Sequence, residues 1–205
     1  MVKTAVMVSG NGSNLQALID SKAKGTLSHV ELSLVVASKE DSYALTRAKE
    51  NSIDAVVVSR KKYKDDVAAF ERELIPYLQK YDIEMIILAG FLTVFTKDFI
   101  SIYKDRIINV HPALLPSFGG RGYYGLRLHR AVLDSGVKVS GATIHYVNED
   151  IDSGKIILQK AVDVKEGDTP ETLQLRIMQQ AEWILLPKAA EMVAIKILEE
   201  KNDKH

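Results

Sequence analysis

Residues 106–116 read RIINVHPALLP, an apolar run that gives way to a loop bounded by two prolines. Apolar, β-branched runs are typical of parallel strands that are buried on both faces. Side chains alternate along a strand, so we predict that Asn109 and His111 project to the same side at its carboxyl end. Open α/β sheets bind their ligands at that end. Pro112 and Pro116 fix the following backbone, which indicates a defined position for the imidazole.

Outward from this stretch, apolar runs alternate with helical patterns along most of the chain. Residues 137–147 and 155–164 form two strand patterns with no helix between them, and they are predicted to be antiparallel to each other. The sequence therefore predicts an open, mostly parallel, Rossmann-like α/β sheet with helices on both faces and an antiparallel strand near the carboxyl end. The other strands are expected at residues 3–8, 30–37, 55–58 and 84–89, and helices at 41–51, 64–80 and 129–133, after residues 14 and 95, and from the N-cap Thr169 onward. Pro187 is expected to break or kink that last helix.

The composition favours a single domain that handles small molecules. No low-complexity linker divides the 205 residues. Lys plus Arg and Asp plus Glu each number 27, so the formal net charge is zero. This balance argues against nucleic-acid and membrane partners. We therefore expect one domain, residues 1–205, with small-molecule substrates.

Cysteine usage and hydropathy narrow the class of protein further. The chain has no cysteine, which excludes disulfides, a thiolate nucleophile and cysteine-ligated metals. No apolar run is long enough for a signal region or a membrane span. We expect a cytoplasmic protein, and the sequence leaves open whether it is a monomer or a homodimer.

The segment 9–14, SGNGSN, follows the first predicted strand and precedes a helix. Strand, glycine turn and helix together are typical of a phosphate site, because the helix N-terminus supplies free N–H groups. A tight turn with Ser13 or Asn14 as the N-cap is the alternative. Leu15 stands where a dinucleotide-binding turn needs a third glycine, which argues against an NAD site.

Three other segments each leave two interpretations open. Residues 90–95, GFLTVF, either belong to the core or form the wall of a pocket for a flat aromatic ligand. The basic residues 60–62 form either a solvated helix entrance or an anion contact. The glycine- and tyrosine-rich residues 118–125 form either a mobile lid or an irregular surface loop.

His111, Asn109 and Asp152 suggest transfer of an acyl-like group to a nucleophile that the substrate brings. Asp152 lies in a polar loop between the last two predicted strands and is available to pair with His111. Asn109 and a protonated imidazole supply hydrogen bonds to an oxyanion. A His–Asp pair moves protons near neutral pH, because imidazole titrates at about 6.5. The alternative is that His111 is a structural loop histidine.

Four segments together resemble those of the phosphoribosylglycinamide formyltransferase family. They are SGNGSNL at 9–15, LAGFL at 88–92, NVHPALLP at 109–116 and DIDSG at 150–154, in the family's order and across most of the chain. The resemblance implies transfer of a formyl group from the co-substrate 10-formyltetrahydrofolate to the amino group of 5'-phosphoribosylglycinamide, in de novo purine (IMP) biosynthesis, with no metal. It also implies a ribonucleotide phosphate site in the amino-terminal part and a folate site in the carboxyl-terminal part.

The resemblance also assigns roles to matching positions. Asn109, His111 and Asp152 would be catalytic, with direct attack of the substrate amine and no acyl-enzyme. The ribonucleotide would contact Gly12, Ser13, Asn14 and Glu182. The formyl folate would contact Leu92, Thr93, Val94, Phe95, Asn109, Asp150 and Lys64.

The chain departs from the family pattern around the folate site. Leu92 and Thr93 stand where members often have Met-Arg, and Val67 stands where they have an arginine. Lys64 or Arg60 would substitute for these charges. Arg127 stands where some members have a histidine.

Other functions compete with this interpretation. Formyltetrahydrofolate hydrolase uses a similar trio but has an extra amino-terminal domain, and methionyl-tRNA formyltransferase needs a carboxyl-terminal domain and a basic surface. A catalytically inactive protein that binds folate or a nucleotide is a further alternative.

Overall fold

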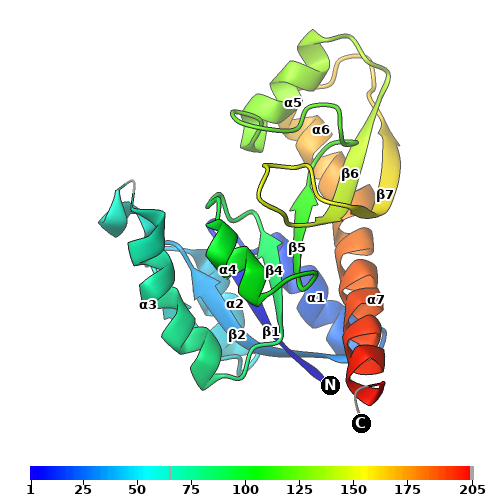
Figure 1. Cartoon of the computed structure of the whole chain (residues 1–205). Coiled ribbons are helices and arrows are strands. Elements are labelled where there is room, and N and C mark those ends of the chain that lie inside the picture. The colour runs from blue at the N-terminus through cyan, green and yellow to red at the C-terminus, as the bar shows by residue number, and fades with distance from the viewer. Residues whose placement is uncertain (65, 204–205) are drawn as a thin grey trace.

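The computed structural model describes residues 1–64 and 66–203. Within these residues, seven strands form one sheet in the order β3-β2-β1-β4-β5-β6-β7 (Figure 1). The strands are β1 (Val2–Val8), β2 (Val30–Ala37), β3 (Ala55–Val57), β4 (Met85–Ala89), β5 (Ile107–His111), β6 (Val139–Tyr146) and β7 (Ile156–Asp163).

The sheet has the mixed direction that the sequence predicts. β1 pairs in parallel with β2 and β4, and the pairs β2–β3 and β4–β5 are also parallel. β6 is antiparallel to both β5 and β7. The connection from β6 to β7 contains no helix, whereas every parallel pair needs a crossover.

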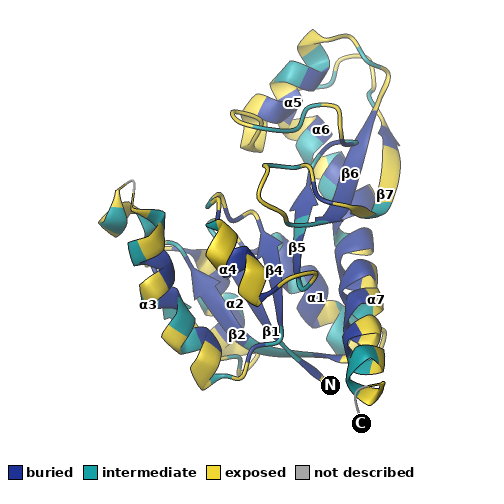
Figure 2. Cartoon of the chain, in the orientation of Figure 1, coloured by how far each residue is buried: buried dark blue, intermediate teal, exposed yellow. Residues whose placement is uncertain are grey.

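Helices cover both faces of the sheet, as predicted. They are α1 (Ser13–Ala23), α2 (Tyr43–Glu50), a 3₁₀ turn η1 (Arg60–Tyr63), α3 (Val67–Lys80), α4 (Lys97–Ile102), α5 (Gly125–Asp134), α6 (Pro170–Ile177), a π-helical turn η2 (Met178–Glu182) and α7 (Trp183–Asn202). One core cluster contains Leu15 of α1 and Ala190 of α7, and the other contains Phe70 of α3 and Phe99 of α4. The central strands are buried between them (Figure 2).

Three predicted helix positions need correction. α3 begins at Val67 rather than Lys64, because Lys64 has a positive φ of 46° and Asp66 caps the helix by accepting a hydrogen bond from Ala69 N. α5 begins at Gly125, four residues before the predicted start, so the tyrosine-rich run leads directly into a helix. Pro187 does not break the last helix, which continues to Asn202. The departure from α-helical geometry lies upstream, in the π-helical turn.

Candidate active site

A cleft of about 980 Å³ runs from the carboxyl ends of β1 and β4 across β5. Residues 9–14 after β1, residues 88–95 at the end of β4 and residues 109–112 at the end of β5 line it, together with residues 120–125, 147–148 and 150–152 and Gln174, Met178 and Glu182. All the predicted site residues except Lys64 line this cleft. Lys64 lines an adjoining hollow of about 570 Å³, which shares Arg60 and residues 92–94 with the cleft.

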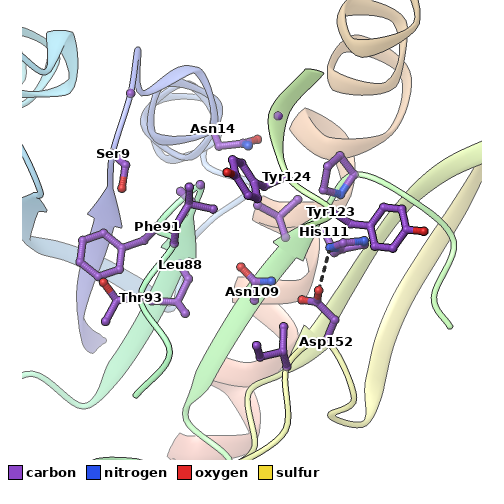
Figure 3. A pocket seen from close by; sticks show the side chains of 18 of the residues that line it. Ser9, Asn14, Leu88, Phe91, Thr93, Asn109, His111, Tyr123, Tyr124 and Asp152 are labelled. Atoms are coloured by element: carbon purple, nitrogen blue, oxygen red, sulfur yellow. Dashed lines mark ion pairs between the residues drawn. The ribbon is translucent and has the colours of Figure 1, made fainter. Parts of the chain in front are cut away.

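His111 and Asp152 lie together in this cleft (Figure 3). Their Nδ1 and Oδ2 atoms are 3.5 Å apart, and the side chains are 5% and 12% exposed. The other ring nitrogen of His111 donates a hydrogen bond of 2.8 Å to the carbonyl of Phe118. Both ring nitrogens therefore face oxygen acceptors, an environment that the doubly protonated imidazolium satisfies. Asp152 is held in turn by the N–H of Gly120, 2.9 Å from Oδ2.

Asn109 is oriented by a histidine that the sequence analysis missed. Asn109 Nδ2 lies 3.1 Å from His145 Nε2, and His145 Nδ1 lies 2.8 Å from the carbonyl of Tyr146. Burial lowers the pKa of His145, which favours the neutral ring; in that form Nδ1 donates to the Tyr146 carbonyl and Nε2 accepts from Asn109. One amide hydrogen of Asn109 remains for a ligand. The signal that would have found His145 is the antiparallel register, which pairs Asn109 with His145.

The turn after β1 exposes the start of α1 to the cleft. Its N-cap is Gly12, with φ of 72° and no side-chain cap, so the alternative with Ser13 or Asn14 as N-cap is wrong. The carbonyls of Gly10 and Asn11 are tied back by Ser42 Oγ and Arg47 Nε, at 2.7 and 3.0 Å. Because no side chain of the described residues caps α1, its first-turn N–H groups are available to an anion.

The glycine at position 12 has a packing reason as well. A Cβ added there would lie 2.7 Å from Cβ of Ala44 in α2, so the turn needs both the left-handed φ and the missing side chain.

Asn14 and Glu182, which are 168 residues apart in sequence, contact each other at the wall of the cleft. Asn14 Nδ2 donates a hydrogen bond of 2.7 Å to Glu182 Oε2. Glu182 is 6% exposed, and burial raises the pKa of its carboxyl to about 7. The π-helical turn carries this carboxylate to the cleft.

The apolar loop after β4 is both core and wall, so the two interpretations of its sequence hold for different residues. Phe91 and Phe95 are each 5% exposed, whereas Leu92 and Val94 are 66% and 47% exposed. Phe95, predicted to contact folate, stacks on Phe99 with ring centroids 4.4 Å apart. The Phe95 ring therefore packs mainly in the core behind the cleft wall and exposes little surface to a ligand.

We also searched residues 1–64 and 66–203 for a metal site and for membrane-spanning helices. In residues 1–64 and 66–203, the structure contains no cluster of three or more His, Cys, Asp or Glu side chains arranged to hold a metal ion. Over the same ranges, no helix is both long and apolar enough to cross a membrane.

Comparisons with known proteins place the chain in a family. The model of the formyl transferase family matches residues 2–189. The chain is 39% identical over 178 residues to a chloroplastic phosphoribosylglycinamide formyltransferase of Arabidopsis thaliana, covering 87% of this chain and 61% of that protein. It is 41% identical over 193 residues to the trifunctional purine biosynthetic protein adenosine-3 of Bos taurus, covering 94% of this chain and 18% of that protein. The chain thus spans less than two thirds of the length of either relative.

Solved structures agree with the sequence relatives. Glycinamide ribonucleotide transformylase 1 from Symbiobacterium toebii superposes with a TM-score of 0.87 at 36% identity, covering 96% of this chain and 89% of that one. Phosphoribosylglycinamide formyltransferase from Bacillus halodurans superposes with a TM-score of 0.84 at 34% identity, covering 93% and 94%. The chain belongs to the formyl transferase family.

Proposed function

We propose that this chain transfers the formyl group of 10-formyltetrahydrofolate to the amino group of 5'-phosphoribosylglycinamide in purine biosynthesis. The observation that carries the proposal is the presence of Asn109, His111 and Asp152 in one cleft between a helix N-terminus and an apolar loop. Such a cleft brings an anionic substrate and a flat apolar one to the same reacting groups. The names of the relatives agree with this acceptor and this reaction.

The ribonucleotide is assigned to the wall formed by α1 and the π-helical turn. The uncapped N–H groups around Ser13 and Asn14 bind the phosphate, because a helix N-terminus favours negative charge. Glu182 accepts a hydrogen bond from the sugar. Its carboxylate is already held by Asn14 and needs no rearrangement to do so.

The formyl folate is assigned to the wall formed by residues 92–95 and the loop that carries Asp150. Leu92 and Val94 offer exposed apolar surface, and Thr93 lies between them. Lys64 and Arg60 line the adjoining hollow and attract the carboxylates of the glutamate tail. The loss of charge at Val67 and Thr93 relative to the family pattern is thereby offset.

The chemistry follows from the hydrogen-bond donors of the trio. The neutral amine attacks the formyl carbon, and the carbonyl oxygen becomes an oxyanion that accepts from the free amide hydrogen of Asn109 and from the imidazolium of His111. The imidazolium donates from Nε2, so the substrate oxygen takes the place of the Phe118 carbonyl. Collapse breaks the bond from carbon to N10, the amine loses one proton, and N10 gains one. Asp152 stabilises the imidazolium throughout.

The test is absorbance-monitored release of tetrahydrofolate from 10-formyltetrahydrofolate, with and without the ribonucleotide. Release that requires the ribonucleotide is the expected result. Release without it would replace the proposal by a hydrolase, and binding without any release would replace it by an inactive binding protein.

The setting of the activity is part of the proposal. Residues 1–205 act as a single formyltransferase domain in the cytoplasm, as a monomer or a homodimer. Light scattering at assay concentrations, together with cell fractionation, tests both points.

A further inference from the structure

The loop between β4 and α4 has little backbone support of its own. Among the described residues, positions 91–95 make no backbone–backbone hydrogen bond to one another or to the rest of the chain. Gly90 opens the loop with φ of 76°, and Thr96 closes it as the N-cap of α4. Side chains must therefore fix the path of this wall.

One such support is a row of aromatic rings below the loop. Phe91 and Phe95 lie within 6.4 Å of Phe70 of α3, measured between ring centroids. These contacts hold the two inward side chains but leave the backbone free to slide over an apolar surface, since dispersion contacts have no fixed direction.

The directional support comes from Glu71, one residue further along α3. Its Oε1 accepts a hydrogen bond from the backbone N–H of Thr96 and its Oε2 accepts one from the Thr96 hydroxyl, each at 2.6 Å. Thr96 Oγ1 in turn accepts from Phe99 N at 3.2 Å. Glu71 is 5% exposed, and no cation of the described chain pairs with it. A buried carboxylate is expensive unless its hydrogen bonds are specific and well aligned.

We infer that Glu71 is a positioning residue that sets the affinity for the formyl donor. Its carboxylate pins the end of the loop through Thr96, so that Leu92 and Val94 present their side chains to the cleft. The ribonucleotide wall lies on other elements and shares no residue with this clamp. The inference rests on the proposed assignment of residues 92–95 to the folate.

The experiment compares KM for both substrates in Glu71→Ala, Glu71→Gln, Thr96→Val and Thr96→Ser. Loss of two hydrogen bonds to a charged group predicts about a tenfold rise in the KM for the formyl donor in Glu71→Ala, with the KM for the ribonucleotide unchanged within about twofold. Thr96→Val should raise the KM for the formyl donor less than Glu71→Ala does, because the Thr96 N–H still donates to Glu71 Oε1, and Thr96→Ser should restore wild-type values because it keeps the hydroxyl. The KM of Glu71→Gln for the formyl donor should lie between those of the wild type and Glu71→Ala, since Gln keeps one acceptor oxygen.

A matched control is Glu191→Gln. Glu191 also ties a loop to a helix, by accepting from Ser28 Oγ at 2.7 Å and from the backbone N–H of His29, but it does not line the cleft. The Glu191→Gln variant should have a lower Tm than the wild type and unchanged KM values for both substrates.

Equal rises in both KM values, or a change in Tm alone, would mean that Glu71 is only structural and would overturn the inference. A wild-type enzyme without ribonucleotide-dependent transfer would refute the proposed function instead. In that case the inference is judged by calorimetric titration with tetrahydrofolate, for which Glu71→Ala should still weaken binding about tenfold and an unchanged Kd would refute it.

Discussion

Replacing Asp152 by Asn tests how much the reaction depends on the ion pair with His111. Asn keeps the shape of the side chain, and its carbonyl oxygen still accepts from the Gly120 N–H. What disappears is a negative charge 3.5 Å from His111 Nδ1, on a side chain that is 12% exposed. With an effective dielectric constant of about 20, two unit charges at this separation attract by about 5 kcal/mol.

Part of that attraction is lost to desolvation, so we expect about 3 kcal/mol to act on the transition state. This predicts a fall in kcat of about 10²-fold, with KM for both substrates little changed. The assay is steady-state formyl transfer at saturating ribonucleotide. Glu149→Gln is the control, because it removes one charge from the same loop at a residue that does not line the cleft. An Asp152→Asn enzyme with full activity would refute the mechanism.

Other predictions address the remaining parts of the cleft. The pKa of Glu182 is raised from 4.5 to about 7 by burial, so its contribution to stability is fully present below pH 4.5 and is lost as pH rises through 7. Unfolding titrations should show wild type losing up to about 3 kcal/mol across this range, while Glu182→Gln shows no such loss. Gly12→Ala should lower the free energy of unfolding, measured in urea, by at least about 2 kcal/mol, because Ala at a positive φ is strained and its Cβ would clash with Ala44. Gly10→Ala should lower it by less than about 0.5 kcal/mol, because a Cβ at this position meets nothing within 4 Å. Lys64→Ala combined with Arg60→Ala should raise KM for a formyl donor with a glutamate tail about tenfold at low salt, and leave a tail-less donor unchanged.

Sequence patterns predicted the sheet because each strand carries a local signal. Apolar runs such as residues 85–89 are continuous, and turn residues bound them, so their type does not depend on distant contacts. The same alternation placed Asn109 and His111 on one side of β5, and both line the cleft. Helix starts were less predictable, because a cap such as Gly12 requires a particular backbone conformation. A glycine permits that conformation but does not enforce it.

The missed contacts are those between residues far apart in sequence. Glu71 accepts from Thr96, 25 residues away, and Asn109 meets His145, 36 residues away. Nothing in the helical pattern of α3 distinguishes Glu71 from the other acid of this helix, Glu73, which is partly exposed and pairs with Lys62. Pairing of these side chains is set by the register of neighbouring elements, which a single sequence does not encode locally.

The nearness of Asp152 to His111 does not follow from the order of the strands. Tyr146, the last residue of β6, pairs with Ile108, so the loop to β7 leaves the sheet near the start of β5 and away from His111. It returns along the sheet because Asp152 adopts a positive φ of 53° and because Gly154 lies so close to the carbonyl of Tyr146 that any Cβ would overlap it. The distance of 3.5 Å between His111 Nδ1 and Asp152 Oδ2 is therefore set by a loop in which Gly154 is needed for a close contact rather than for a positive φ. This explains how a polar segment that has the composition of an ordinary turn delivers a buried carboxylate to the imidazole.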